Sequence, residues 1–205
     1  MASFSTVGFD LDLTLVDTKE RILFAARRGF ADVGFEVGDD ELVPLLGFPL
    51  AHKAARLAPT APVAAFVQRY RFHYRSDEAP ACPAEPGAAA ALEAVRNEGG
   101  RCVVVSAKQG ALVHEALERA GLAEAVSAVH GELFAAQKAT ALRAEEAQAY
   151  VGDHPGDIEA ARVAGAVAIG VATGANDTAC LREAGADVVF ASLLEFPDWY
   201  RSDVM

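Results

Sequence analysis

From residue 86 onward, the chain alternates short, continuous apolar runs with segments of helical periodicity. This alternation restricts the possible folds more than any other feature of the sequence. The apolar runs are rich in β-branched residues, as in RCVVV at 101–105. Continuous apolar runs of this length are typical of strands buried on both faces of a parallel sheet. The predicted strands lie at 101–105, 125–129 (the weakest run), 147–151, 166–171 and 187–190.

Helical patterns fill the intervals between these runs. The predicted helices cover 86–97, 110–120, 155–164 and 177–184. Each is followed by a glycine, which suits a left-handed position at a helix end. Strands that alternate with helices imply right-handed crossovers between parallel strands. The sequence therefore predicts an α/β fold with a Rossmann-like, doubly wound parallel sheet as its core.

The first predicted strand, at 5–9, stands apart from the others. About ninety residues separate Asp10 from the next strand, too many for one crossover helix. This interval contains further helical patterns at 18–33, 40–46, 50–57 and 62–75, followed by a proline-rich segment at 77–86. We therefore predict a core domain formed by 1–16 and 84–205, with a small α-helical domain inserted at 17–83.

Composition restricts the partners of the chain. Acidic residues number 29 and basic residues 18, a formal net charge of -11. Such a chain repels nucleic acid and anionic membrane surfaces, so neither is an expected partner. The three cysteines are widely spaced, which argues against a disulfide framework or a zinc site. With no apparent secretory signal and no apolar run of transmembrane length, we predict a cytoplasmic protein.

Polar residues follow several of the predicted strands. Ligands of open α/β sheets bind beyond the carboxyl ends of the strands, so these side chains are expected to meet there. They are Asp10, Asp12, Ser106, Lys138 and Asp153.

Asp10 and Asp12 lie just past the first strand, in the sequence DLDLT at 10–14. Two such carboxylates repel each other unless a cation lies beside them. Magnesium prefers oxygen ligands of this kind. One carboxylate can bind metal and attack phosphorus while the other handles protons. A solvated turn with an aspartate helix cap explains the same residues without any catalytic role.

A second acidic pair lies in GDHPGD at 152–157. Asp153 follows a predicted strand and suits a metal ligand. Asp157 falls in the first turn of the next helix, where it could support a metal or simply cap the helix. His154 could be a ligand or a hydrogen-bonded loop residue.

Ser106 ends the RCVVVS run, and its hydroxyl together with the backbone N–H groups of Ala107 and its neighbours could hold a phosphate. A serine helix cap is the alternative. Lys108 could make a second contact with an anion, or could be an ordinary surface lysine. Lys138 begins a helical stretch, and alone it would also be read as a surface residue.

Four motifs occur together and in order: FDLDLTLVD at 9–17, VVVSAK at 103–108, Lys138, and VGDHPGD at 151–157. In this combination the chain resembles the haloacid dehalogenase superfamily, and within it the phosphoglycolate-phosphatase-like branch with a helical cap. The resemblance covers essentially the whole chain, and it implies that 1–16 and 84–205 form the catalytic core and that the helical domain at 17–83 is the cap. One departure is Leu13, since the family commonly has glycine before the motif threonine.

The resemblance implies a magnesium-dependent phosphatase that hydrolyses a small phosphomonoester through an aspartyl-phosphate. Asp10 would be the nucleophile. Asp12 would protonate the leaving alkoxide and then activate water, and its backbone carbonyl would bind the metal. Thr14 would help orient this loop.

The remaining motif residues would bind phosphate and metal. The resemblance implies that Ser106 and Lys138 hold the phosphoryl oxygens and that Lys138 offsets the charge of Asp10. Asp153 would complete the magnesium site, and Asp157 would support it directly or through water.

Specificity is expected to come from the cap. There, a loop that begins at Gly47 resembles a family loop that faces the active site. Further candidates are Arg71, His73, Tyr74 and Arg75, which could equally form an ordinary polar helix face.

Three other functions remain open. A sugar-phosphate mutase would use the same aspartyl-phosphate, and a phosphonate hydrolase would need a cap lysine, for which Lys53 is the candidate. A catalytically silent binding module of the same fold is the third. The expected partner is a small phosphorylated metabolite, and the protein could be a monomer or a homodimer.

Overall fold

A computed structural model describes residues 4–203 of the chain. These residues divide into two compact units, each described here by itself. One unit combines the segment that ends at Asp17 with the segment that starts at Pro83, and the other is Thr18–Cys82. The role of the second unit as a cap remains a prediction.

The first unit is built on a parallel sheet of six strands in the order β3-β2-β1-β4-β5-β6. This arrangement confirms the predicted α/β fold class. The strands are β1 (Thr6–Phe9), β2 (Arg101–Val105), β3 (Ala128–His130), β4 (Ala149–Gly152), β5 (Val167–Val171) and β6 (Val188–Phe190).

The position predicted for β3 was only partly right. The expected strand at 125–129 overlaps β3, which spans Ala128–His130, but its first residue belongs to a 3-10 turn at Ala123–Ala125. Leu122, which precedes this turn, is 3% exposed. Ala125 therefore belongs to this turn rather than to the sheet.

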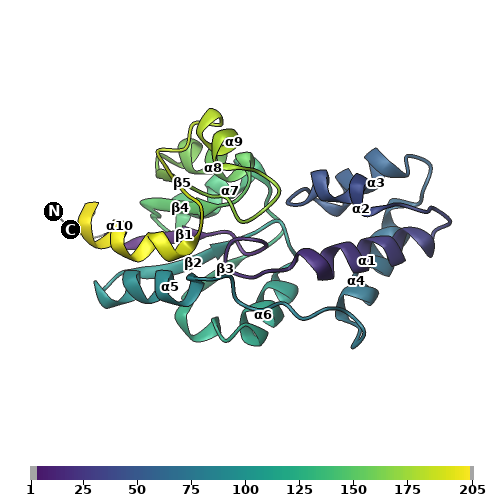
Figure 1. Ribbon diagram of the computed structural model, residues 1–205, viewed down its shortest axis with the longest axis horizontal. Coiled ribbons are helices and arrows are strands. Elements are labelled where there is room, and N and C mark those ends of the chain that lie inside the picture. Colours follow the sequence, from purple (N-terminus) through teal and green to yellow (C-terminus); the bar gives the residue numbers. More distant parts are fainter. Residues whose placement is uncertain (1–3, 204–205) are drawn as a thin grey trace. The chain divides into compact units, whose positions relative to one another are not determined.

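Helices cover both faces of the sheet, with α5 and α6 on one side and α7, α8 and α9 on the other (Figure 1). Helix α10 packs against α5. The helices of this unit are α5 (Ala88–Asn97), α6 (Gly110–Arg119), α7 (Lys138–Ala144), α8 (Pro155–Ala164), α9 (Thr178–Glu183) and α10 (Phe196–Asp203).

The strand order reverses direction at β1. After β1 the chain forms β2 and β3 on one side, and then returns to form β4, β5 and β6 on the other. In sheets of this type, ligands bind at the carboxyl ends of the strands beside such a reversal. Asp10 follows β1 and Asp153 follows β4, so both lie at this position.

The second unit is helical, with α1 (Lys19–Ala31), α2 (Asp39–Leu42), α3 (Leu50–Leu57) and α4 (Val63–Arg75). Helices α1 and α4 pack together through stacked rings of Phe30 and Phe66, whose centroids are 4.1 Å apart. The helix expected at 40–46 was only partly right, because α2 gives way to a 3-10 turn at Val43–Leu45. This turn contains Pro44, which lacks the N–H that a continuous helix needs.

The buried guanidinium of Arg21 joins the ends of this unit. Its nitrogens donate to the carbonyls of Tyr74, Ala79 and Pro80 at 2.6, 2.9 and 2.5 Å. No helix within residues 4–203 has the length and apolar character needed to cross a membrane.

Candidate active site

Asp10 lies directly beyond the carboxyl end of β1. Its backbone N–H donates to the carbonyl of Val151 in β4 at 2.8 Å, which extends the sheet pairing to this residue. The chain then turns back, because the N–H groups of Leu15 and Val16 both donate to the carbonyl of Leu11 at 3.0 Å. The side chain of Asp10 is 9% exposed, so the carboxylate lies in a largely dry environment.

Leu13 takes the conformation that glycine adopts most easily. Its φ is 62°, in the left-handed region that non-glycine residues rarely occupy. Its side chain is 2% exposed and its carbonyl accepts a hydrogen bond from Thr173 Oγ1. The replacement of the common glycine by leucine therefore preserves the turn, and burial of the leucine side chain opposes the backbone strain.

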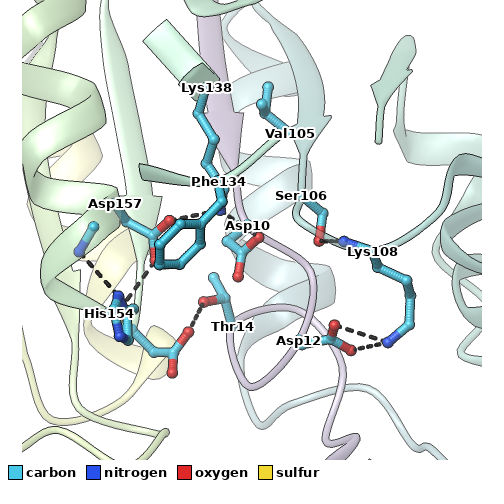
Figure 2. A network of polar contacts seen from close by, with 12 residues as sticks. Asp10, Asp12, Thr14, Val105, Ser106, Lys108, Phe134, Lys138, His154 and Asp157 are labelled. Atoms are coloured by element: carbon cyan, nitrogen blue, oxygen red, sulfur yellow. Dashed lines mark hydrogen bonds and ion pairs between the residues drawn. The ribbon is translucent and has the colours of Figure 1, made fainter. Parts of the chain in front are cut away.

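Lys138 is buried at the start of α7, with 3% of its surface exposed. Its Nζ lies 2.8 Å from Asp10 Oδ1 and 2.6 Å from Asp157 Oδ1. Figure 2 shows the lysine side chain descending from its helix to these two carboxylates. Lys138 thus balances part of the negative charge that β1 and α8 bring together.

The carboxylates of Asp10, Asp153 and Asp157 form a buried cluster in which one oxygen from each lies within 4.8 Å of the other two. Burial raises the pKa of Asp10 to about 6, while the Lys138 ammonium opposes the shift. Burial, followed by the charges of Asp157 and Asp10, raises the pKa of Asp153 well above its usual value. A bound cation would relieve this repulsion, and an all-oxygen ligand set suits a hard divalent metal. The cluster therefore fits a divalent metal ion.

Asp157 also has a structural role. Its Oδ2 accepts from the backbone N–H of His154 at 3.1 Å, which completes a capping box at the start of α8. The carboxylate is packed so closely that a Cβ at Gly152 would collide with it. Asp157 therefore caps a helix and holds Lys138, and its predicted contact with the metal stays a prediction.

The carboxylate of Asp12 lies outside this acidic cluster. Its Oδ1 and Oδ2 accept from Lys108 Nζ at 2.5 and 2.8 Å (Figure 2). The two motif carboxylates thus have different partners, Lys138 for Asp10 and Lys108 for Asp12. This difference suits a division of labour between them. The contact of the Asp12 backbone carbonyl with a metal remains a prediction.

Ser106 follows β2 and is 1% exposed. Its Oγ accepts from the backbone N–H of Lys108 at 3.3 Å, so the segment bends there. Helix α6 begins at Gly110, as the sequence predicted, and Gln109 is its N-cap. Ser106 is therefore not a helix cap, and the predicted phosphate-binding segment that includes Ala107 is a bend between β2 and α6.

Thr14 connects the first motif to the last. Its Oγ1 donates to Asp153 Oδ1 at 3.2 Å. His154 Nδ1 accepts from the backbone N–H of Gly156 at 3.0 Å, so this histidine caps α8 through that nitrogen.

The structure adds residues that sequence reasoning missed. The loop after β5 supports Asp153, because Asn176 Nδ2 donates to its backbone carbonyl at 3.2 Å. In the same loop, a Cβ at Gly174 would collide with the Asp153 carboxylate. Tyr150 contacts Lys138 from β4, with Oη 2.9 Å from Nζ. None of these residues carries a charge, so in the sequence they look like ordinary core or loop residues and could not be predicted as part of the site.

The cap candidates all belong to the second unit. Gly47 has a φ of 81° in the loop before α3. His73 Nε2 lies 2.7 Å from Asp32 Oδ2, Tyr74 is buried, and Arg71 and Arg75 line a surface groove along α4. Substrate contacts for these residues remain predictions.

Comparisons with known proteins agree on one family. Residues 7–171 match the family described as haloacid dehalogenase-like hydrolase. A phosphoglycolate phosphatase of Pasteurella multocida is 26% identical, over 93% of this chain and 95% of that protein. A predicted phosphatase of Clostridium acetobutylicum has the same fold, with a TM-score of 0.85, 22% identity and coverage of 96% and 97% of the two chains. A putative β-phosphoglucomutase of Thermotoga maritima is also similar, with a TM-score of 0.72, 21% identity and coverage of 98% and 99%.

Proposed function

The chain belongs to the haloacid dehalogenase-like hydrolase family, and from this premise we propose that it is a magnesium-dependent phosphatase of small phosphomonoesters. The observation that carries the proposal is the buried cluster of Asp10, Asp153 and Asp157, in which the ammonium of Lys138 contacts Asp10 and Asp157. It combines a nucleophile, an oxygen-only cation site and a fixed positive charge at the end of one sheet. Phosphoryl transfer requires little else beyond positioning.

The first step transfers the phosphoryl group to the protein. A carboxylate oxygen of Asp10 attacks phosphorus, and the bond between phosphorus and the ester oxygen breaks. Asp12 in its protonated form gives its proton to the leaving oxygen, so the alcohol departs neutral. The products of this step are the alcohol, an aspartyl-phosphate on Asp10 and ionised Asp12.

The second step regenerates the enzyme. Asp12 accepts a proton from water as the water oxygen attacks phosphorus. The bond between phosphorus and the Asp10 carboxylate breaks, which releases inorganic phosphate and leaves Asp12 protonated again. Asp12 thus acts as an acid in the first step, where it loses its proton, and as a base in the second step, where it regains one.

Polar and charged groups around Asp10 would stabilise the phosphoryl group in both steps. Lys138, with its Nζ 2.8 Å from Asp10 Oδ1, and the Ser106 hydroxyl would hold the phosphoryl oxygens. Magnesium bound by Asp10, Asp153 and the backbone carbonyl of Asp12 would supply further positive charge and orientation at the phosphoryl group. Thr14 orients Asp153 for this task.

The test is phosphate release from a panel of small phosphate esters that includes 2-phosphoglycolate, with magnesium or with a chelator. We expect turnover with magnesium by the native chain and a loss of at least a thousandfold in Asp10→Asn, because the nucleophile is gone. Turnover that persists in the chelator or in Asp10→Asn would refute the proposal.

A sugar-phosphate mutase is the second candidate function. It would use the same Asp10 and the same fold, which the chain shares with the similar mutase structure. In that case the phosphoryl group would pass to a sugar hydroxyl instead of water, and turnover would require a sugar bisphosphate as activator. The panel separates the two functions, because a phosphatase releases phosphate without such an activator.

The geometry gives less support to a phosphonate hydrolase. Lys53 is 3% exposed, and its Nζ donates to the carbonyl of Phe48 at 2.5 Å. A lysine that forms a Schiff base needs a neutral amine that can reach the substrate. A silent binding module is also disfavoured, because binding alone does not require so many buried, mutually repelling carboxylates.

A further inference from the structure

The ammonium of Lys138 has three acceptors within hydrogen-bond distance. Asp157 Oδ1 and Asp10 Oδ1 lie at 2.6 and 2.8 Å, and Tyr150 Oη lies at 2.9 Å. A lysine ammonium carries three N–H groups and accepts none, so each acceptor can take one of them. Tyr150 supplies the uncharged member of this set.

The Tyr150 hydroxyl has a defined orientation. Because Lys138 can only donate, Tyr150 must accept from it, and its single proton points elsewhere. Tyr150 Oη lies 2.6 Å from the carbonyl oxygen of Val105 and 3.4 Å from Asp157 Oδ1, and it donates to the nearer acceptor, Val105. The ring is fully buried, and burial is the main reason why the pKa of the phenol lies well above its usual value. The hydroxyl therefore stays neutral and keeps both hydrogen bonds.

Tyr150 reaches across a whole strand to make this contact. It lies in β4 and pairs with Gly8 of β1, while Val105 lies in β2 on the far side of β1. Gly8 leaves the room that the ring occupies, since a Cβ there would lie 2.8 Å from Tyr150 Cδ2. The phenol thus connects the end of β2 to the start of α7.

We propose that Tyr150 is a positioning residue, which fixes the Lys138 ammonium against Asp10 and ties it to the backbone that precedes Ser106. The inference rests on the proposed function, since Lys138 and Ser106 are the two groups assigned to the phosphoryl oxygens. Because the Tyr150 hydroxyl contacts both Lys138 and the carbonyl of Val105, the pairing of the strands helps to fix the distance between Lys138 and Ser106. Small errors in the placement of such groups lower rates substantially.

The first test is Tyr150→Phe, which removes only the hydroxyl. We expect kcat to fall about 10-fold or more, with KM changed by less than about threefold, because placement matters most in the transition state. The matched control is Tyr200→Phe. Tyr200 is equally buried and donates to the carbonyl of Phe4 at 3.1 Å, but it lies away from the candidate site in α10. The control should lose stability while kcat stays within about twofold of the native value.

A double-mutant cycle separates positioning from general damage. If Tyr150 acts through Lys138, Tyr150→Phe should change the residual activity of Lys138→Met by less than about twofold. Equal fold-losses in both backgrounds would overturn the proposal, and so would an unchanged kcat in Tyr150→Phe. If Tyr150→Phe does not fold, 4-fluorophenylalanine at position 150 fills the space of the hydroxyl, and the same outcomes apply.

An activity-independent measurement keeps the inference distinct from the proposed function. In protein labelled with 15N-lysine, we expect a slowly exchanging ammonium signal that disappears in Lys138→Met. Tyr150→Phe should shift this signal and speed its exchange with solvent, and Tyr200→Phe should leave it unchanged. An unaltered Lys138 signal in Tyr150→Phe would overturn the inference. Absence of turnover on every ester, with the signal altered as expected, would refute the phosphatase function alone.

Discussion

The Nζ of Lys108 lies 2.5 and 2.8 Å from the two carboxylate oxygens of Asp12, and the side chains of Lys108 and Asp12 are 7% and 16% exposed. This ion pair fixes the proposed acid and base between β1 and the bend that follows β2. It also places a positive charge close to the position expected for the leaving group.

Lys108→Met should therefore impair catalysis. We expect kcat/KM to fall about 10-fold or more, because Asp12 loses the partner that positions it. Lys108→Arg, which keeps the charge, should retain part of the activity. The measurement is steady-state phosphate release, with Lys19→Met on the exposed surface of α1 as the control. Native activity in Lys108→Met would mean that the ion pair has no role in turnover.

Asp10→Asn should stabilise the metal-free protein at pH 8. The pKa of Asp10 is raised from 3.8 to about 6, so its contribution to stability is lost as the pH rises between these values. The asparagine removes a buried charge that is unfavourable above pH 6. We expect thermal melting in the presence of a chelator to show a Tm higher by a few degrees at pH 8 and little change at pH 4.

Magnesium should reverse the order of the Tm values of the native chain and Asp10→Asn at pH 8. The ion should raise the Tm of the native chain more than that of Asp10→Asn, because the native carboxylate is a ligand. A native chain that melts above Asp10→Asn in chelator at pH 8 would contradict the assigned direction of the Asp10 pKa.

Glu85 provides a second pH-dependent prediction. This residue is 9% exposed, and its N–H donates to the carbonyl of Leu15 at 2.9 Å. Burial, followed by the charge of Asp17, raises the pKa of its side chain from 4.5 to about 7. The stability contributed by protonated Glu85 is therefore lost between about pH 4.5 and pH 7.

Glu85→Gln should accordingly raise the Tm at pH 8 more than at pH 5. The control is Glu93→Gln on the exposed face of α5, which should shift the Tm similarly at both values. The measurement is thermal melting of both variants at pH 5 and pH 8, with each Tm compared with that of the native chain at the same pH. A Glu85→Gln effect of equal size at pH 5 and pH 8 would argue against the raised pKa.

The left-handed backbone of Leu13 predicts an unusual order of stability. Leu13→Ala and Leu13→Gly should both be less stable than the native chain, since each empties a buried site, at a cost of about 2–5 kcal/mol. Because φ at this position is 62°, glycine should be more stable than alanine by about 1 kcal/mol. Urea denaturation measures the free energy of unfolding of the native chain and of both variants.

Leu92 serves as the matched control, because it is fully buried in the middle of α5. In a helix interior glycine is less favourable than alanine by about 1 kcal/mol, so the order of the two variants should be reversed there. The same order at Leu13 and Leu92 would exclude backbone strain at Leu13.

Much of the core could be predicted from the sequence because strands buried on both faces are continuously apolar. The carboxyl ends of parallel strands meet at one edge, so Asp10, Ser106 and Asp153 were expected together before any geometry was known. The half-buried strand β3 gave a weaker pattern, and its start was misplaced for that reason.

Other parts of the site depend on relationships that no local pattern records. Tyr150 lies within an apolar run and looks like any buried aromatic residue, since its partners Lys138 and Val105 are distant in the sequence. The pairing of Lys108 with Asp12 depends on the bend after β2, which has no periodicity. Gly174 is required only because the Asp153 carboxylate packs against it.

The central claim is that Asp10 carries the phosphoryl group during turnover. The most direct test is to mix the protein and magnesium with an ester labelled with 32P in the phosphoryl group, quench in acid within one turnover, and map the labelled peptide. We predict label on the peptide that contains Asp10, in amounts that require magnesium and vanish in Asp10→Asn. Label on another residue, or rapid phosphate release by the native chain with no labelled protein at any quench time, would contradict the account.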